Sequence, residues 1–307
     1  MKKILIATEK PFAAVAVQGI QKVFDSADME TVLLEKYTDK AQLLAAVKDV
    51  DALIIRSDEV DAEVFQAASS LKIVVRAGAG YDNVDLAAAT EHGVVVMNTP
   101  GQNANAVAEL ALGLMVYAVR NFYDGSSGTE LMGKRLGIHA YGNVGRNVAR
   151  IARGFGMEIF AYDAFCPAEV MEKDGVTALS SAEELYTCCP FVSIHIPATP
   201  ETKNSINEEL LEKMPKGAVL VNTARKEVID EAGLLRIMET RSDFRYVTDI
   251  MPQNDAVFKE KFAKRYFATP KKIGAQTAEA NNNAGIAAAN QIVAFFLKGE
   301  TKFQVNK

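Results

Sequence analysis

Short hydrophobic runs alternate with segments of helical periodicity along most of the chain. Buried strands of parallel sheets form such runs because helices cover both of their faces. Helical patterns, for example at residues 40–47 and 62–68, separate the runs. The alternation predicts an α/β fold with two doubly wound parallel sheets of the Rossmann or flavodoxin-like kind. The predicted strands are 4–7, 31–34, 52–56, 73–75, 94–97, 135–139, 158–162, 191–196, 218–222, 245–249 and 265–268.

One strand–turn–helix–strand unit, at residues 135–163, has the layout of a dinucleotide-binding motif. Gly142 has no Cβ, so a pyrophosphate could approach its backbone, and Gly145 allows the helix to pack closely on the strand. The start of the helix offers N–H groups and a partial positive charge to the phosphates. The candidate cofactor ligands in this turn are Tyr141, Gly142, Asn143, Val144 and Gly145.

The second strand of this unit ends on Asp163, which lies 18 residues past Gly145. Its carboxylate could accept hydrogen bonds from both hydroxyls of an adenine ribose and would repel a 2′-phosphate, so NAD is expected rather than NADP. One residue departs from the G-x-G-x-x-G pattern, because Ala140 occupies the position of the first glycine.

Two longer helical patterns indicate how the domains are joined. The apolar stretch at 103–120 is expected to lead from the first domain into the second, and the Ala-rich helix at 277–297 is expected to return to the first. We therefore predict a substrate-binding domain of residues 1–98 plus 278–307 and an NAD-binding domain of residues 99–277. A cleft between them would hold cofactor and substrate.

The composition is that of an ordinary globular protein, with 49% hydrophobic and 24% charged residues. The formal net charge is −5 and no Lys/Arg run occurs, so nucleic acid is not expected as a partner. The three cysteines have neither a disulfide nor a metal-site spacing, which favours reduced thiols and the cytoplasm. The longest apolar stretch, 106–119, contains Glu109 and is too short to span a bilayer, so no membrane contact is expected.

Three further motifs resemble those of the D-2-hydroxyacid dehydrogenase family. They lie at residues 75–86, which resemble the family's substrate loop, at 98–109, and at 215–225. The resemblance runs along nearly the whole chain and implies hydride transfer between NAD and C2 of a small 2-hydroxy acid, in a homodimer. No regulatory domain follows in the sequence, so we expect the short form of such an enzyme, without inhibition by serine.

Arg225 is the candidate for holding the substrate carboxylate. It follows a predicted strand of the parallel sheet, where ligands bind in such folds, and its guanidinium can form two parallel bonds with a carboxylate. The resemblance further implies that Pro197 lies over the adenine and that Gly274 admits the nicotinamide ring. It implies that Ala224 and Asp249 reach the nicotinamide side, with Asp249 accepting from the carboxamide.

The proton-transfer residue departs from the family pattern. The family has a histidine after Thr-Pro and a glutamate 29 residues beyond the arginine, whereas this chain has Lys271 and Lys272 after Pro270, and Asn254 at the second position. A lysine can transfer the same proton and has no tautomer for a glutamate to fix, so the two departures agree. The alignment leaves Lys271 and Lys272 both open, and we prefer Lys272.

Substrate specificity rests on the first domain. Arg56, Ser57, Arg76, Gly78 and Asn103 are the candidate substrate ligands, and their motifs most resemble family members that oxidise D-3-phosphoglycerate to 3-phosphohydroxypyruvate for serine biosynthesis. Two alternatives stay open. One is a dehydrogenase of an unphosphorylated 2-hydroxy acid such as glycerate, and the other is a catalytically silent scaffold that senses NAD.

Overall fold

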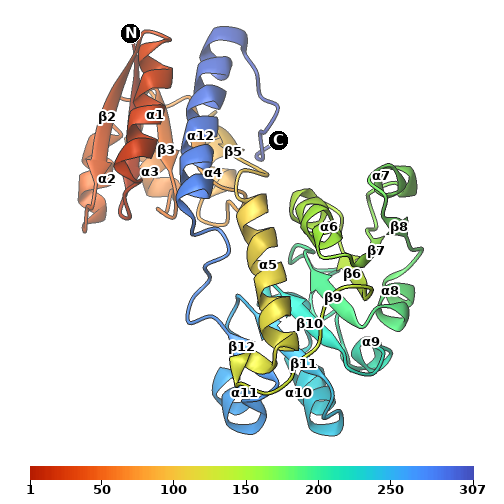
Figure 1. The fold of residues 1–307 in the computed structure, drawn as a ribbon. Helices are drawn as coiled ribbons and strands as arrows, with labels where there is room; N and C mark the ends of the chain where they lie inside the picture. The colour runs from red at the N-terminus through yellow and green to blue at the C-terminus, as the bar shows by residue number, and fades with distance from the viewer. The chain divides into compact units, whose positions relative to one another are not determined.

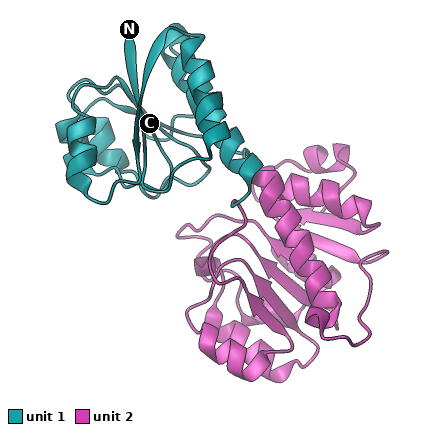
Figure 2. Cartoon of the chain, turned by 60° about the vertical axis from the view of Figure 1, so that its left-hand side comes forward, with its two compact units in different colours: residues 1–103, 276–307 teal, residues 104–275 magenta.

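The computed structural model describes all residues from 1 to 307 and divides them into two compact units (Figure 2). Unit 1 comprises residues 1–103 and 276–307, and unit 2 comprises residues 104–275. Each unit is built on a parallel β-sheet of its own, and each is described by itself below.

Unit 1 contains a five-stranded sheet of order β2-β1-β3-β4-β5, in which all neighbours are parallel (Figure 1). Alternate strand residues enter two separate hydrophobic cores, because successive side chains of a strand point to opposite faces. Helices α1 and α12 cover one face, and α2, α3 and α4 cover the other. The strands are β1 (Lys2–Thr8), β2 (Met29–Glu35), β3 (Ala52–Ile55), β4 (Ile73–Arg76) and β5 (Val95–Asn98), and the helices are α1 (Ala14–Asp25), α2 (Lys40–Ala46), α3 (Ala62–Ala67), α4 (Leu86–Glu91) and α12 (Ala278–Lys298).

Unit 2 contains a seven-stranded parallel sheet of order β12-β11-β10-β9-β6-β7-β8. Helices α5, α6 and α7 pack against one face, and α8 to α11 pack against the other. The strands are β6 (Arg135–His139), β7 (Glu158–Tyr162), β8 (Thr177–Ala178), β9 (Phe191–Ile194), β10 (Val219–Asn222), β11 (Arg245–Thr248) and β12 (Tyr266–Ala268). The helices are α5 (Ala104–Val119), η1 (Asn121–Tyr123), α6 (Asn143–Gly154), α7 (Ala168–Lys173), α8 (Ala182–Cys188), α9 (Glu208–Glu212), η2 (Lys226–Val228), α10 (Glu231–Thr240) and α11 (Asp255–Phe262).

The predicted fold class, two doubly wound parallel sheets, is confirmed. Every predicted strand is present, with ends that differ by no more than two residues. Only the edge strand β8 was not predicted, because its two residues are too short to form a hydrophobic run.

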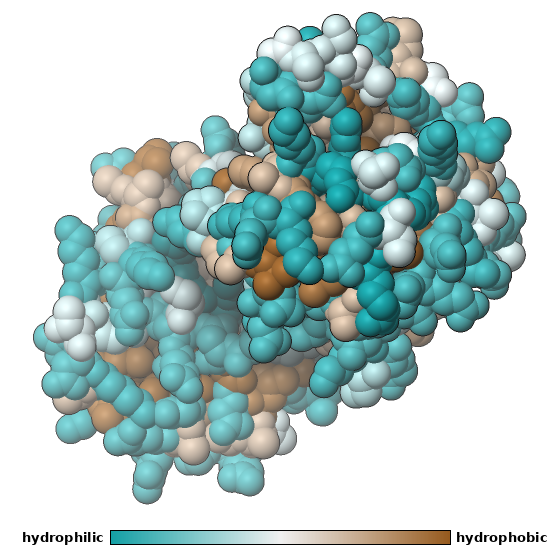
Figure 3. Space-filling model, turned by 90° about the horizontal axis from the view of Figure 1, so that it is seen from below, coloured by the Kyte–Doolittle hydropathy of each residue, from teal (hydrophilic) through white to brown (hydrophobic).

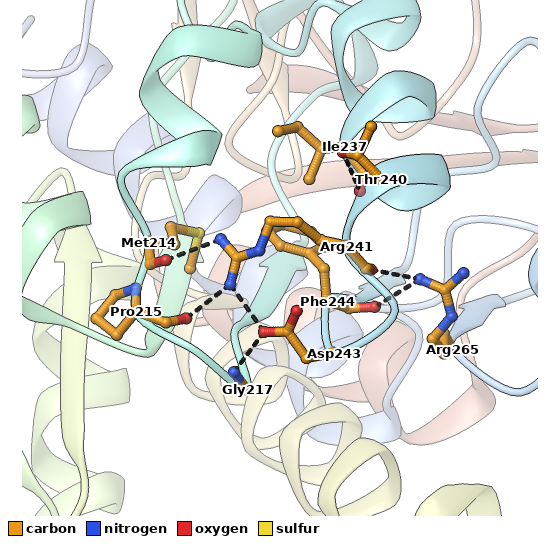
Figure 4. Close-up of polar contacts among 9 residues, drawn as sticks. All are labelled: Met214, Pro215, Gly217, Ile237, Thr240, Arg241, Asp243, Phe244 and Arg265. Atoms are coloured by element: carbon orange, nitrogen blue, oxygen red, sulfur yellow. Dashed lines mark hydrogen bonds and ion pairs between the residues drawn. The ribbon is translucent and has the colours of Figure 1, made fainter.

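Two arginines tie together the loops that precede strands β10, β11 and β12 (Figure 4). Arg241 bonds the carboxylate of Asp243 at 2.8 Å, and Asp243 also accepts from the N–H of Gly217 at 2.7 Å. Arg265 donates to the carbonyl oxygens of Arg241 and Phe244. This network fixes the N-terminal ends of the strands and lies away from their C-terminal ends, where the candidate catalytic residues follow.

The surface agrees with the charged composition. Figure 3 shows hydrophilic residues over most of the face that it draws, with smaller hydrophobic areas between them. None of the helices combines the length and the apolar character that crossing a membrane requires.

Candidate active site

The turn between β6 and α6 is shaped for close approach of a ligand to the backbone. A Cβ at Gly145 would lie 2.3 Å from the carbonyl oxygen of Ala140, so only glycine fits where the helix meets the strand. A Cβ at Gly142 would meet no atom within 4 Å, which leaves open space before the start of the helix. Ala140 has a φ of +82°, a conformation that L-residues rarely adopt, so the turn keeps a glycine-like backbone at this alanine. The turn therefore fits a dinucleotide pyrophosphate.

Asp163, directly after β7, organises this turn. Its carboxylate accepts from the N–H groups of Tyr141 at 2.7 Å, Phe165 at 2.8 Å and Cys166 at 3.0 Å. A carboxylate has roughly four acceptor positions, so about one remains for a ribose hydroxyl. Phe165, which the sequence analysis did not single out, is 96% exposed beside this acid. Its position, two residues after Asp163, was the feature of the sequence that could have identified it.

Two histidines lie at the ends of neighbouring strands, with His139 buried as the last residue of β6 and His195 partly buried directly after β9. The Nδ1 atom of His139 is 3.3 Å from the hydroxyl of Tyr186, and Nε2 of His195 is 2.9 Å from Oγ of Ser193. Burial lowers the pKa of His139 to about 4 and that of His195 to about 3. Both rings are therefore neutral at pH 7, and they serve as packing and hydrogen-bonding groups.

Asp249, directly after β11, holds the loop that carries the two lysines. It is fully buried, and its Oδ1 accepts from the hydroxyl of Thr269 at 2.9 Å and the N–H of Ile273 at 2.8 Å. Its Oδ2 accepts from the N–H of Gly274 at 2.7 Å. A Cβ at Gly274 would lie 2.8 Å from this oxygen, which explains the glycine. Three of about four acceptor positions are used, all of them by the loop that follows β12.

Arg225 and Lys272 converge on one carbonyl oxygen. Nη1 of Arg225 donates to the oxygen of Ala224 at 2.9 Å, and Nζ of Lys272 donates to the same oxygen at 3.2 Å. Asn222 shapes this turn, because its side chain accepts from the N–H of Ala224 and donates to the carbonyl of Arg225. The structure thus brings together a guanidinium and an amine at the C-terminal ends of β10 and β12.

Lys271 is placed differently. Both lysines are exposed, but for Lys271 the contact is made by its carbonyl oxygen, which accepts from the hydroxyl of Thr269 at 2.8 Å. The structure therefore brings Lys272, rather than Lys271, next to Arg225. Asn254, at the position of the family's glutamate, precedes α11, and its N–H donates to the carboxylate of Glu231 at 2.5 Å. Pro197 is exposed in the loop after β9.

In unit 1, Arg56 is held by its own surroundings. Its guanidinium donates to the carbonyl oxygens of Lys10 and Pro11 at 3.1 and 3.2 Å and to the side chain of Asn281 at 2.5 Å. It also lies over the ring of Phe12, 5.1 Å from the ring centre. Burial lowers the pKa of Arg56, which stays far above neutrality. Ser57 beside it is exposed, and Asn103 is partly exposed.

The substrate-loop candidates in unit 1 contact one another. Nε of Arg76 donates to the carbonyl of Arg56 at 2.9 Å, and the Arg76 guanidinium lies across Gly78, where a Cβ would be 1.5 Å from Nη1. The sequence analysis missed Asp58, which is 2% exposed and fixes this region. Its carboxylate accepts from the hydroxyl of Tyr37 and from the N–H groups of Glu9 and Arg56. The sequence around Asp58 is polar and charged, so it did not indicate that this side chain is buried.

Comparison with known proteins connects this geometry to one family. A family model described as D-isomer specific 2-hydroxyacid dehydrogenase, NAD binding domain, matches residues 115–271. The NAD⁺-bound 3-phosphoglycerate dehydrogenase of Entamoeba histolytica is 49% identical, with a TM-score of 0.88 over 100% of this chain and 99% of that one.

Two curated relatives differ in name and in length. Hydroxypyruvate reductase of Thermotoga maritima is 35% identical over 86% of this chain and 90% of its own length. D-3-phosphoglycerate dehydrogenase of Methanocaldococcus jannaschii is 36% identical over 82% of this chain. The match covers 51% of that protein, so the chain spans about half the length of this relative.

Proposed function

Because the chain belongs to the D-isomer-specific 2-hydroxyacid dehydrogenase family and uses NAD, we propose that it oxidises D-3-phosphoglycerate to 3-phosphohydroxypyruvate in serine biosynthesis. The observation that carries the chemistry is the convergence of Arg225 and Lys272 on the carbonyl oxygen of Ala224. The full-length likeness to the Entamoeba enzyme supports the choice of substrate.

Arg225 and Lys272 have different roles at the reacting carbon. Bound NAD supplies the hydride acceptor. Arg225 binds the substrate carboxylate through its guanidinium, and Nζ of Lys272 takes the proton of the 2-hydroxyl group. Both donors bond the oxygen of Ala224, so their nitrogen atoms lie close enough together for one small substrate to contact both. In the reverse direction the Lys272 ammonium returns the proton to the 2-oxo group.

The cofactor ligands follow the ends of parallel strands. We assign the pyrophosphate to the N–H groups of residues 141–145 and the ribose to Asp163. Pro197 is assigned to the adenine, and the buried groups Ala224, Asp249 and Gly274 to the nicotinamide side. The open space at Gly142 and the remaining acceptor position of Asp163 support this assignment.

The substrate's phosphate is assigned to unit 1, to Arg56, Ser57, Arg76, Gly78 and Asn103. Since Arg56 also makes three internal hydrogen bonds, Arg56→Ala would disturb unit 1 as well as substrate binding. Arg56→Lys keeps the charge but not the planar fork and is the better variant. We expect it to raise KM for the phosphorylated substrate by about tenfold, the loss of roughly one charge-assisted bond.

Initial rates with D-3-phosphoglycerate and with D-glycerate test the proposal. We expect kcat/KM to favour the phosphorylated acid, and Lys272→Ala to lower kcat by about 10²–10⁴-fold. Lys271→Ala, on the same loop, is the matched control and should keep most of the activity. Equal rates for both acids would refute D-3-phosphoglycerate as the preferred substrate. Unchanged turnover in Lys272→Ala would refute Lys272 as the proton-transfer residue.

A second function is favoured by the likeness to the Thermotoga enzyme over 90% of its length. It is the reduction of an unphosphorylated 2-oxo acid such as hydroxypyruvate by the same Lys272 and Arg225. The comparison of substrates above decides between the two. A chain that binds NADH but turns over neither acid would be the silent NAD-sensing scaffold.

We also propose a homodimer formed through unit 2. Two apolar side chains support it, since Met132 is 71% and Phe155 is 40% exposed, and Met132 contacts Gly156 next to Phe155. Met132→Glu should shift the mass measured by light scattering from dimer to monomer. The three free cysteines support a cytoplasmic location.

A further inference from the structure

Two adjacent cysteines lie outside the site described above. Cys188 is the last residue of α8, and Cys189 follows it with an extended backbone, φ −112° and ψ 116°. In a regular helix consecutive side chains do not face each other. Here the change of conformation between the two residues brings their Sγ atoms to 3.3 Å.

The two thiols differ in access. Cys189 is fully buried, and burial raises the pKa of its thiol above the ordinary range, so it is a poor nucleophile by itself. Cys188 is partly exposed at the end of the helix. A reagent can therefore reach Cys188 from solvent and then meet Cys189 without a large rearrangement.

We propose that Cys188 and Cys189 form a binding site for trivalent arsenic and organic arsenoxides, soft electrophiles whose single arsenic atom bonds two sulfurs. With an arsenoxide, two As–S bonds form and the As=O bond breaks. Both thiol protons leave with the oxygen as one water, and arsenic stays trivalent. Soft thiolate ligands suit such an atom.

The geometry favours a bridging atom over a direct disulfide. A disulfide would require the sulfurs, now 3.3 Å apart, to close to about 2.05 Å. The Cα atoms of consecutive residues are about 3.8 Å apart, below the usual disulfide range of about 4.4–6.8 Å. A third atom between the sulfurs removes the need for that closure.

Occupancy of this site should weaken NAD binding. A Cβ at Gly137 of β6 would lie 3.1 Å from Cβ of Cys189 and 2.9 Å from Cγ of Leu185, so α8 and β6 already touch without spare room. An atom bonded to Cys189 on the side that faces Gly137 would displace the end of α8 or β6 by a small amount. Because β6 leads directly into the turn at 140–145, that displacement reaches the cofactor site.

Phenylarsine oxide and intact-mass spectrometry test the site. We expect one phenylarsenic adduct with loss of one water, stable to excess glutathione and removed by 2,3-dimercaptopropanol. Cys166→Ser, which alters the third cysteine, should keep this adduct, and Cys188→Ser and Cys189→Ser should each lose it. If either of the latter variants keeps the glutathione-stable adduct, or if the parent protein forms none, the site is refuted. Cys188→Ser, at a partly exposed position, keeps the test valid should Cys189→Ser not fold.

The coupling to the cofactor is measured with NADH fluorescence anisotropy, which is free of tryptophan signal because the chain has no tryptophan. We expect the arsenic adduct to raise the NADH dissociation constant by about tenfold, because overpacking a tight contact typically costs enough free energy for a tenfold loss of affinity. Treated Cys188→Ser should bind NADH like its untreated form. An unchanged dissociation constant in the bridged parent would refute the coupling, even if the adduct forms.

Discussion

Asp249→Asn tests how the lysine-bearing loop is held. The Asp249 carboxylate is buried and accepts from the hydroxyl of Thr269 and the N–H groups of Ile273 and Gly274. Asparagine keeps one acceptor oxygen, so its NH₂ group must face at least one of these donors. With the oxygen toward Thr269 and Ile273, the Gly274 N–H, now 2.7 Å from Oδ2, has no acceptor.

The expected cost follows from that unpaired donor. Losing a hydrogen bond to a charged group costs about 1.5–3 kcal/mol, and leaving a buried donor unsatisfied costs about 1–3 kcal/mol. The two overlap, so we expect the loop to open more easily by about 3 kcal/mol, roughly a hundredfold. Native-state hydrogen exchange at Ile273 and Gly274 measures this opening locally. Hydrogen exchange is used here because the chain has two compact units, which can unfold in separate transitions.

Asp243→Asn is the matched control. Asp243 also bonds a backbone N–H, that of Gly217, but it precedes β11, whereas Asp249 follows the strand. Its replacement should leave exchange at Ile273 and Gly274 unchanged. Asp249→Asn should also lower kcat, because the loop places Lys272 beside the Ala224 carbonyl. Exchange within about threefold of the parent at both amides would contradict the role assigned to Asp249.

Three further predictions follow from the same structure. Ala140→Gly should raise the stability of unit 2 by about 0.5–1 kcal/mol. A positive φ costs an L-residue about 1–2 kcal/mol, and the greater flexibility of glycine in the unfolded chain cancels part of the gain. A lower melting temperature would contradict this prediction. Arg241 lowers the pKa of Asp243 to about 2, so the ion pair stabilises the fold above pH ~4 and is lost as the pH falls through about 2. Acid titration of the unfolding of unit 2, which contains Asp243, should show Asp243→Asn less stable by about 1–2 kcal/mol at pH 7 and equal to the parent below pH 2. A lysine base, which ordinarily titrates near ~10.4, predicts oxidation rates that rise from pH 7 to 9 while reduction rates do not, and a flat oxidation profile in stopped assays would argue against it.

The fold was readable from the sequence because parallel strands buried on both faces are continuous apolar runs. The same pattern located the turn between β6 and α6, and it marked Ala140 as a departure. It could not tell whether the turn would change shape at that residue. The structure shows that Ala140 has a φ of +82°. The helix packs closely on this residue, because a Cβ added to Gly145 would lie 2.3 Å from the Ala140 carbonyl oxygen.

The contacts that organise the site were not readable. Asp249 holds backbone N–H groups 24 and 25 residues away, and Asp58 accepts from the N–H of Glu9, 49 residues away. Every residue except proline has such a donor, so these bonds leave no mark on the sequence. For the same reason Asp249 could be predicted as a cofactor ligand from resemblance, but not as the residue that holds the lysine loop.

The order of the strands supports the proposal that an amine takes the place of an imidazole in this chain. In the sheet β10, β11 and β12 are neighbours, and their last residues are in register, Asn222 beside Thr248 and Thr248 beside Ala268. Arg225, Asp249 and the lysine loop therefore leave the sheet side by side, whatever their side chains are. A short histidine ring needs a partner to fix its orientation and tautomer. In the proposed mechanism a lysine on the same loop needs only a length that brings Nζ near the Arg225 guanidinium, and both groups bond the Ala224 carbonyl oxygen. The register of the strands thus places the proposed proton carrier beside Arg225, whichever residue type fills that role.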